Sequence, residues 1–425
     1  MFDLDGLGAS LPRGAQRAMG ELARRPLLGP AHRPFPWGFW RAVRWTFEML
    51  SASGCIRENS MKKRKAPRAS NPTLERFCAE RDSAMSAIGK ALRERDFSTI
   101  EEAGEFLKQF IGLPMGQIPE VLNRGAKAET DEEKADRLFV SAMEKDSVGV
   151  LRRGLKEVLK VNPQHVRALT ALALSERNAV RSEKGLREAI AIGEKSVGPL
   201  MEESKGELWG YVEARPYLEA RYYLAEFLSM KEKRISEAVE ECQAILALNT
   251  NDNQGVRDLL LGLLLREQRY EEAGRLVVRY KDDCSAIWMY GKVMLSFVQA
   301  ARDANLNTED DFHQWFVARI QSIGVDGASA SVEFRVAEAE LQRALDQNPW
   351  GAVYLLMPQS HFETPMPESY VEGGEEEARV FLEFQGMAWM RNPSAMIWLL
   401  LTASPWLIKH GFNPELLGGW GGAQN

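Results

Sequence analysis

Three widely separated segments of the chain end a helix in nearly the same way, and this recurrence limits the folds that the chain can adopt. Residues 155–163 read LKEVLKVNP, residues 242–250 read CQAILALNT and residues 341–349 read LQRALDQNP. In each segment an amphipathic helical pattern is stopped by Asn and then by Pro, or by Thr in the second case. A helix ending that recurs along a chain is typical of stacked helical hairpins, so we predict an all-α solenoid.

Small residues recur where the two helices of each predicted hairpin would cross. Ala238 and Ala273 are 35 positions apart, close to the 34-residue period of one class of helical-hairpin repeat. The pattern pairs residues 224–225 (Leu-Ala) with Ala238 and residues 260–261 (Leu-Leu) with Ala273. This alternation of small and large residues favours a repeat array over a generic helical bundle.

Two further motifs resemble those of a bacterial-type tetratricopeptide repeat (TPR) family. Residues 213–221 read EARPYLEAR and residues 249–257 read NTNDNQGVR, similar to the family's RPY…AR helix start and its NPNDNQGVR turn. The resemblance covers roughly residues 71–400 and is densest over 207–297. Thr250 replaces the family's proline, and a long insertion follows Arg302. The resemblance implies a TPR-like helical-hairpin solenoid, and it carries no assigned activity.

The pattern along the chain predicts seven segments. They are an extension over 1–70, disordered or mis-started with Met61 as the alternative start; an N-terminal helical hairpin over 71–112; a linker over 113–130; TPR-like repeats over 131–300; an insertion over 301–335; the last repeat helix and C-terminal capping helices over 336–400; and a flexible tail over 401–425.

Composition excludes several classes of protein. The net charge of -6 and the pI near 5.7 argue against a general nucleic-acid binder. The four cysteines are scattered and form no CxxC pair, so the sequence indicates neither a disulfide framework nor a zinc site. The most apolar stretch, 395–408, is short and contains Pro405, which is typical of a core helix rather than a membrane span. We therefore expect a cytoplasmic protein with no membrane partner.

The sequence carries no recognisable catalytic constellation. The five histidines stand far apart and none lies in an HxxxH or HExxH setting. His165 follows the helix-ending Asn162-Pro163, where we expect a solvated turn residue. We predict a chain that is not an enzyme, with no catalytic, cofactor-binding or metal-binding residues.

Binding to another protein is the favoured function, because the first helix of each TPR-like hairpin lines a concave surface. Tyr, Trp and Arg on such a surface are the residue types that dominate interface energies. Tyr222 and Trp288 could instead pack between hairpins, and the sequence leaves both interpretations open. The predicted protein-binding residues are Arg167, Glu219, Arg221, Tyr222, Glu226, Arg257, Asp258, Trp288 and Lys292.

Two alternatives remain beside an interaction module for an unidentified protein or peptide. The first is a regulatory or nucleic-acid-associated protein that uses the basic segment from Arg57 to Arg68, although the overall charge disfavours nucleic acid as a partner. The second is an enzyme with a site in residues 302–374, which no sequence feature favours.

Overall fold

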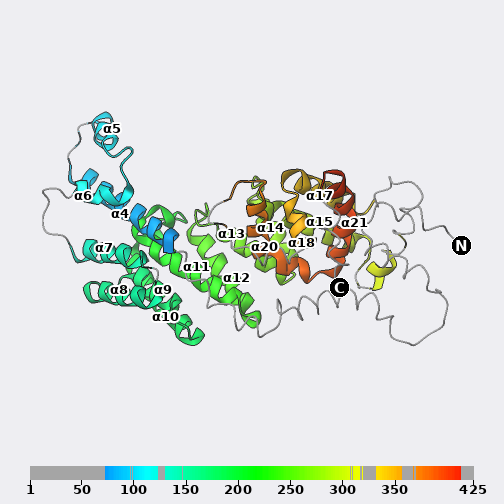
Figure 1. The fold of residues 1–425 in the computed structure, drawn as a ribbon, viewed down its shortest axis with the longest axis horizontal. Coiled ribbons are helices and arrows are strands. Elements are labelled where there is room, and N and C mark those ends of the chain that lie inside the picture. Colours follow the sequence, from blue (N-terminus) through cyan, green and yellow to red (C-terminus); the bar gives the residue numbers. More distant parts are fainter. Residues whose placement is uncertain are drawn as a thin grey trace, which may run out of the picture. The chain divides into compact units, whose positions relative to one another are not determined.

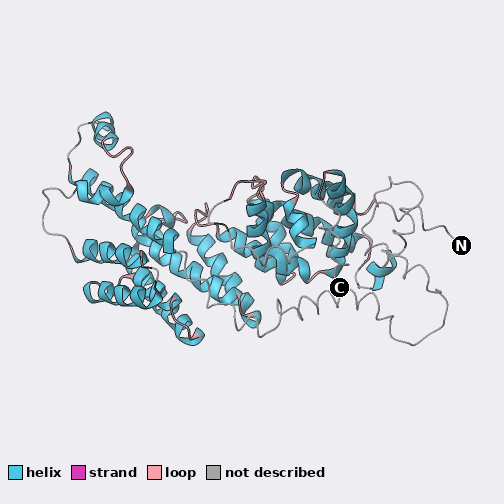
Figure 2. Ribbon diagram, viewed as in Figure 1, coloured by secondary structure: helices cyan, strands magenta, loops and turns pink. Residues whose placement is uncertain are grey.

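The computed structural model describes residues 72–122, 130–306, 310–315, 332–356 and 370–412, apart from the single positions 96, 98 and 146, and in addition residues 308, 318 and 367. Every regular element in this part of the chain is a helix, as Figure 2 shows, and it holds one isolated antiparallel bridge, between Glu207 and Asn249. The predicted all-α class is therefore confirmed. The chain forms two compact units that meet in sequence between Val256 and Arg257.

The first unit contains the hairpin helices, which follow one another in the order of the sequence (Figure 1). Their bounds are α7 (Asp131–Met143), α8 (Val148–Val161), α9 (Val166–Leu174), α10 (Ala179–Glu203), α11 (Arg215–Ser229) and α12 (Ile235–Leu248). α7 packs on α8, α9 on α10 and α11 on α12, and each hairpin also contacts the next one. Three short 3-10 helices complete the connections, at Leu208–Gly210 (η3), Val212–Ala214 (η4) and Glu232–Arg234 (η5).

The helix ends follow the local sequence. Thr130 and Glu133 form a reciprocal capping box at the start of α7, in which each side chain accepts a hydrogen bond from the other residue's backbone N–H. α8 ends at Val161, and Asn162, the residue before Pro163, is its C-cap. Pro216 lies in the first turn of α11, where its missing N–H costs no hydrogen bond.

A small-residue contact repeats from the first hairpin to the second. A Cβ added at Gly154 of α8 would lie 2.7 Å from the Cβ of Ala142 in α7. A Cβ added at Gly185 of α10 would likewise lie 2.7 Å from the Cβ of Ala173 in α9. Both members of the pair recur 31 positions later, since 173 − 142 and 185 − 154 are both 31. The two hairpins therefore cross at equivalent positions, and glycine permits the close approach.

The N-terminal helices are arranged differently from the predicted hairpin over 71–112. They are α4 (Pro72–Glu94), α5 (Ile100–Lys108), η2 (Met115–Gln117) and α6 (Ile118–Leu122). α4 packs against α6, η2 and α7. Ala84, Phe110 and Ile118 form a small buried cluster that joins α4 to the segment after α5. Part of the predicted linker is thus helical, because Ile118 supplies an apolar anchor, while residues 123–129 lie outside the described residues.

The second unit contains helices whose bounds lie within the described residues. They are α13 (Val256–Arg266), which begins at the boundary, α14 (Tyr270–Arg279), α15 (Ala286–Asp303), α17 (Arg335–Gln347), α18 (Trp350–Leu356), α20 (Glu375–Met390) and α21 (Pro393–Lys409). α15 packs on α17 and α20, and α18 packs on α20. The fully buried Tyr290 donates from its hydroxyl to the Asn348 carbonyl and accepts from the Ala352 N–H, both at 2.9 Å. Its ring stacks on Phe381, with 4.8 Å between centroids.

Two predicted boundaries in this unit need comment. α21 continues to Lys409, whereas the sequence pattern assigned residues from 401 onward to a flexible tail. Ala403 and Leu407 are fully buried, and their packing holds the helix together through Pro405. Most of the predicted insertion over 301–335 lies outside the described residues. No helix in the described ranges is long and apolar enough to cross a bilayer.

Candidate functional site

A cavity of about 290 Å³ lies in the first unit. Three of its walls come from the first helices of successive hairpins: Phe139 of α7, Thr170 of α9 and Tyr222 of α11. α4 supplies a fourth side, and the turn before α13 closes a fifth with Asn253. Three of the helices around the cavity, α7, α9 and α11, are thus first helices of hairpins, on which the sequence analysis placed the binding surface.

The cavity combines aromatic walls with charge. Trp209, Tyr222 and Tyr223 line it together with Phe139. The rings of Tyr222 and Tyr223 meet edge to face, with 6.1 Å between centroids. Aromatic side chains of this kind offer large contact areas at a low entropic cost, which suits them to bind apolar groups.

A largely buried ion network adjoins the cavity, and Arg81, Arg167 and Glu219 of this network line it. Asp82 of α4 is 2% exposed, and its carboxylate accepts from Arg167 of α9 and from Arg215 of α11. The bond from Arg215 Nη1 to Asp82 Oδ1 measures 2.5 Å, and the bond from the neighbouring Arg81 Nε measures 3.0 Å. The Asp82 carboxylate therefore accepts hydrogen bonds from three guanidinium groups. Two of these bonds connect α4 to the α9/α10 and α11/α12 hairpins.

Arg167 also forms an ion pair with Glu219, and both residues line the cavity. The Nε and Nη2 atoms of Arg167 donate to the two carboxylate oxygens of Glu219 at 2.8 and 2.9 Å, the two-bond geometry that makes arginine–carboxylate pairs strong. Burial alone would lower the pKa of Arg167, but Glu219 and Asp82 outweigh it and raise the pKa above its usual value. The guanidinium is therefore permanently charged and fixed in direction.

Cys78, which also lines the cavity, is a poor nucleophile. Burial and the nearby carboxylate of Glu219 raise the pKa of its thiol above the ordinary value. A raised thiol pKa keeps the sulfur protonated near neutral pH, and the thiolate is the reactive form. The cavity offers surfaces for binding, with no activated thiol.

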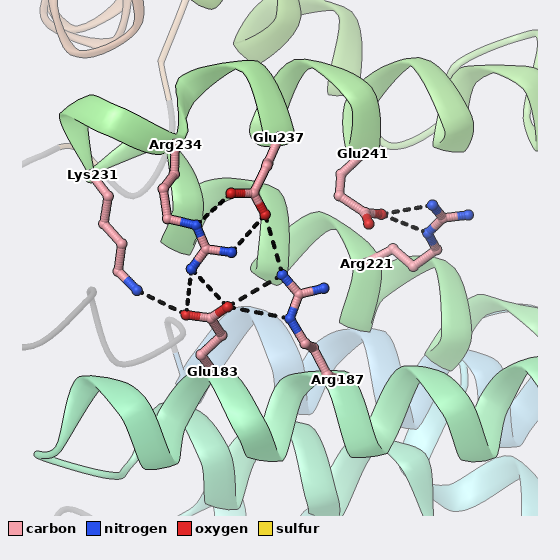
Figure 3. A network of polar contacts seen from close by, with 7 residues as sticks. All are labelled: Glu183, Arg187, Arg221, Lys231, Arg234, Glu237 and Glu241. Atoms are coloured by element: carbon pink, nitrogen blue, oxygen red, sulfur yellow. Dashed lines mark hydrogen bonds and ion pairs between the residues drawn. The ribbon is translucent and has the colours of Figure 1, made fainter.

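Three of the predicted binding residues meet at this cavity. Arg167, Glu219 and Tyr222 all line it. Arg221 lies elsewhere: it donates to Glu241 of α12 at 2.6 Å, and this pair holds the α11/α12 hairpin together (Figure 3). Glu226, one turn beyond Tyr222, is half-buried and is not part of the cavity lining.

The other four predicted residues belong to the second unit and bond to one another or to their neighbours. Trp288 is fully buried and donates from Nε1 to Asp258 at 2.7 Å. Arg257 donates to Asp283 at 2.8 Å, and Lys292 donates to the carbonyl oxygen of the same residue at 3.2 Å. The packing alternative therefore applies to Trp288, whose indole lies in the core.

Sequence reasoning missed the α4 side of the cavity. Asp82 lies on the apolar stripe of α4, between Cys78 and Met85 at spacings of four and three. A carboxylate on an apolar stripe indicates a buried partner, so this position was the available clue. Arg215 precedes the proline of the EARPYLEAR motif, but its partner is 133 positions away and no local pattern identifies it.

The structure also shows the surroundings of His165 and of the possible metal-ligating side chains. His165 is 7% exposed rather than solvated; its Nδ1 accepts from the Ala168 N–H at 3.1 Å and caps α9, and its Nε2 lies 3.0 Å from Asp136. No group of three or more metal-ligating side chains occurs within the part of the chain that the structure describes. The basic segment from Arg57 to Arg68, and much of 302–374, fall outside that part.

A second polar network joins the last two hairpins of the unit, as Figure 3 shows. Glu183 at the start of α10 accepts from Lys231 at 3.0 Å, from Arg234 at 2.7 Å and from Arg187 at 3.2 Å. Burial would raise the pKa of Glu183, but these hydrogen bonds lower it to about 2. The network fixes the turn between α11 and α12 to α10.

Comparison with protein-family models found no match for this chain, and comparisons with curated proteins and with solved structures found none either.

Proposed function

We propose that this chain is a non-enzymatic protein–protein interaction module. In this proposal a TPR-like array of helical hairpins binds a peptide or protein segment on the face formed by its first helices. The observation that carries the proposal is the meeting of Arg167, Glu219 and Tyr222 at one aromatic-walled cavity. Arg167 lies on α9, and Glu219 and Tyr222 lie on α11. Each of these two helices is the first helix of its hairpin.

The size of the cavity favours part of a polypeptide as the occupant. About 290 Å³ lies at the lower end of the range for small-molecule sites, which runs from about 300 to 1,000 Å³. That volume suits one or two side chains of a segment whose remainder lies along the surface. Anchoring side chains in a well-packed pocket is the usual basis of interface affinity.

The ion network supports binding by fixing the cavity before a partner arrives. Arg167 has two bonds to Glu219 and one to Asp82, so its position changes little on binding. A preformed site loses less side-chain entropy when it binds. The repeated Gly–Ala crossings of the first two hairpins support the TPR-like part of the proposal.

The test is a selection from a displayed random peptide library with the 425-residue chain as bait. Peptides that are retained should bind the parent chain, and their affinity should fall at least about tenfold in Tyr222→Ala, the usual size of a hot-spot loss. Tyr370→Ala, which removes another tyrosine, 47% exposed and outside this unit, serves as the matched control. Melting curves must first show that both variants are folded.

Two outcomes would count against the proposal. The first is a library that yields no peptide above background. The second is a set of peptides that bind Tyr222→Ala and the parent equally. Trp288→Ala is unsuitable for this experiment, because removing a fully buried indole creates a core cavity whatever the function is.

A further inference from the structure

We infer that the cavity binds an uncharged aromatic side chain of the captured segment, and that an apolar neighbour of this side chain packs on the exposed face of α4. The inference rests on the proposed function, since it names the residues that the captured segment presents. Two of the surfaces involved, α4 and the segment between α10 and α11, lie outside the paired hairpin helices.

The charged groups of the lining already have counterions. Arg167 donates two hydrogen bonds to Glu219 and one to Asp82. Arg81 Nη2 lies 3.0 Å from Asp82 Oδ1 as an ion pair. A charged side chain that entered the cavity would lose its hydration and meet no unpaired charge of opposite sign, which is costly. The pairing of the lining charges therefore selects a neutral occupant.

The walls favour an aromatic ring over an aliphatic chain. Four aromatic side chains line the cavity: Phe139, Trp209, Tyr222 and Tyr223. Pairs of aromatic rings gain free energy beyond that of the area they bury, as the edge-to-face rings of Tyr222 and Tyr223 illustrate. Arg167 adds a guanidinium group, which stacks readily on the face of a ring.

The volume of the cavity fits one such side chain. An enclosed apolar cavity of about 150 Å³ holds one benzene molecule. The cavity here measures about 290 Å³, which accommodates an indole, or a phenyl ring with the backbone that carries it. Phe139 is 1% exposed whereas Asn253 is exposed, so the lining runs from the core to the surface. A ring can enter while its backbone remains near Asn253, whose amide can bond to a peptide group.

The wall at Trp209 is linked to the end of α12. Glu207 and Asn249 form an antiparallel bridge, and the Thr250 N–H donates to the Gly206 carbonyl at 2.8 Å. The proline that the similar TPR family has in place of Thr250 could not make this bond, because proline lacks an N–H. The departure from the family pattern thus helps to position an aromatic wall of the cavity.

α4 continues the lining onto the surface. Successive residues of a helix are about 100° apart around its axis, so Phe77, Cys78, Arg81 and Met85 fall within about 100° of one another. Cys78 and Arg81 line the cavity, whereas Phe77 and Met85 are 49% and 46% exposed. Exposed apolar side chains beside a pocket are typical of an interaction surface. A segment anchored in the cavity therefore has an apolar surface next to it on which to pack.

The first test uses N-acetyl amino-acid amides, which differ only in the side chain. Ligand-observed NMR with the full chain should show the tryptophan or phenylalanine amide binding at least about fivefold more tightly than the leucine amide. The lysine amide, which carries a charge, should bind more weakly still. Equal binding of the aromatic and leucine amides, tighter binding of the lysine amide, or no binding of either aromatic amide would overturn the inference.

Variants test whether the aromatic amide binds in this cavity. Tyr223→Leu keeps an apolar lining but removes one ring, so it should weaken binding of the aromatic amide about fivefold and leave binding of the leucine amide unchanged. Tyr222→Leu should act in the same way and replaces the first variant if melting curves show that chain to be unfolded. Tyr211→Leu, at a half-buried tyrosine outside the lining, should change neither. Aromatic-amide binding that a folded lining variant leaves unchanged would contradict the assignment.

Peptides from the library test the anchor itself. Replacing the anchoring aromatic residue of a retained peptide by Leu should weaken binding at least about tenfold. Peptides that depend on Tyr222 but tolerate Leu at every aromatic position would overturn the inference and leave the proposed function intact. A library that yields no peptide, beside an aromatic amide that binds as expected, would do the reverse.

Phe77→Ser tests the contribution of α4. The change removes an exposed apolar side chain outside the lining, so it should weaken the peptides about fivefold and leave the aromatic amide unchanged. A loss of amide binding in this variant would mean that the change acts through the cavity. Peptides whose affinity is the same for Phe77→Ser and the parent would overturn the assignment of α4 as a docking face.

Discussion

Arg215 donates from Nη1 to Oδ1 of Asp82 at 2.5 Å, although the two residues are 133 positions apart. The same guanidinium donates from Nε to the carbonyl of Trp209 at 3.0 Å and lies over the indole ring, 5.4 Å from its centroid. Arg215 therefore fixes both α4 and an aromatic wall of the cavity. One buried side chain thus links the N-terminal helix to the cavity wall.

Replacing Asp82 with Asn should release α4 from the hairpins. The change leaves Arg81, Arg167 and Arg215 without their shared carboxylate, and breaking a buried ion pair typically costs about 3 to 5 kcal/mol. Denaturant unfolding should show a loss of that size. Hydrogen exchange should increase over 72–94, the span of α4.

Glu240→Gln is the matched control, because it removes an exposed carboxylate from α12. It should change the free energy of unfolding by less than about 0.5 kcal/mol. An Asp82→Asn chain as stable as this control, with unchanged exchange over α4, would show that the network does not hold the helix.

Thr170→Val should stabilise the chain without ligand by up to about 1 kcal/mol, or leave its stability unchanged. The hydroxyl has no partner within the described residues, and an unsatisfied buried hydroxyl costs free energy that a methyl group of the same shape avoids. Thermal unfolding of both chains measures the difference. A loss of more than about 1 kcal/mol would mean that the hydroxyl makes a structural hydrogen bond in the protein, and it would contradict this prediction.

Gly262→Ala should destabilise the second unit by about 2 kcal/mol or more. A Cβ at this position of α13 would lie 2.2 Å from the carbonyl oxygen of Phe384, and a backbone atom of α20 cannot move aside cheaply. Gly274→Ala in α14 meets no atom within 4 Å and should stabilise its helix by about 0.5 to 1 kcal/mol. Urea unfolding of the two variants should therefore give opposite signs; equal effects would contradict the close contact of α13 with α20.

The Glu183 network should make stability depend on acid pH. The folded-state pKa of about 2 lies below the ordinary value of 4.5, so the stabilisation is fully present above pH 4.5 and is lost as the pH falls towards 2. With allowance for solvent screening around this 17% exposed side chain, the contribution is about 1 to 2 kcal/mol. Glu183→Gln should cost that amount at pH 7 and almost nothing near pH 2. A difference between parent and variant that is independent of pH would rule out this ionic role.

The ends of several helices were predictable from the sequence, because the information for a helix end is local. The endings at Asn162, Asn249 and Asn348 are all observed as helix C-caps, and Pro216 begins α11 as its position in the motif indicates. Helix caps and amphipathic stripes depend on neighbours within a few residues. Arg167, which the sequence places on the first helix of its hairpin, lies on α9 and lines the cavity.

The Asp82 ion network and the burial of Trp288 depend on contacts between residues that lie far apart in the sequence. Nothing near Asp82 indicates that its partners are Arg167 and Arg215, which lie 85 and 133 positions away. Tryptophan is a residue type that is common at interfaces, yet Trp288 is buried. Asp258 accepts a hydrogen bond from its indole N–H, which satisfies the polar end of the buried ring. The residue type alone does not show whether a tryptophan lies at an interface or in the core.

The most direct test of the account is hydrogen exchange on the full chain, with and without a library-selected peptide. We predict added protection in α9 and α11, which carry Thr170 and Tyr222 into the cavity, and no such protection in Tyr222→Ala at the same peptide concentration. Protection confined to α20 and α21, or protection that persists unchanged in the variant, would contradict binding at this cavity.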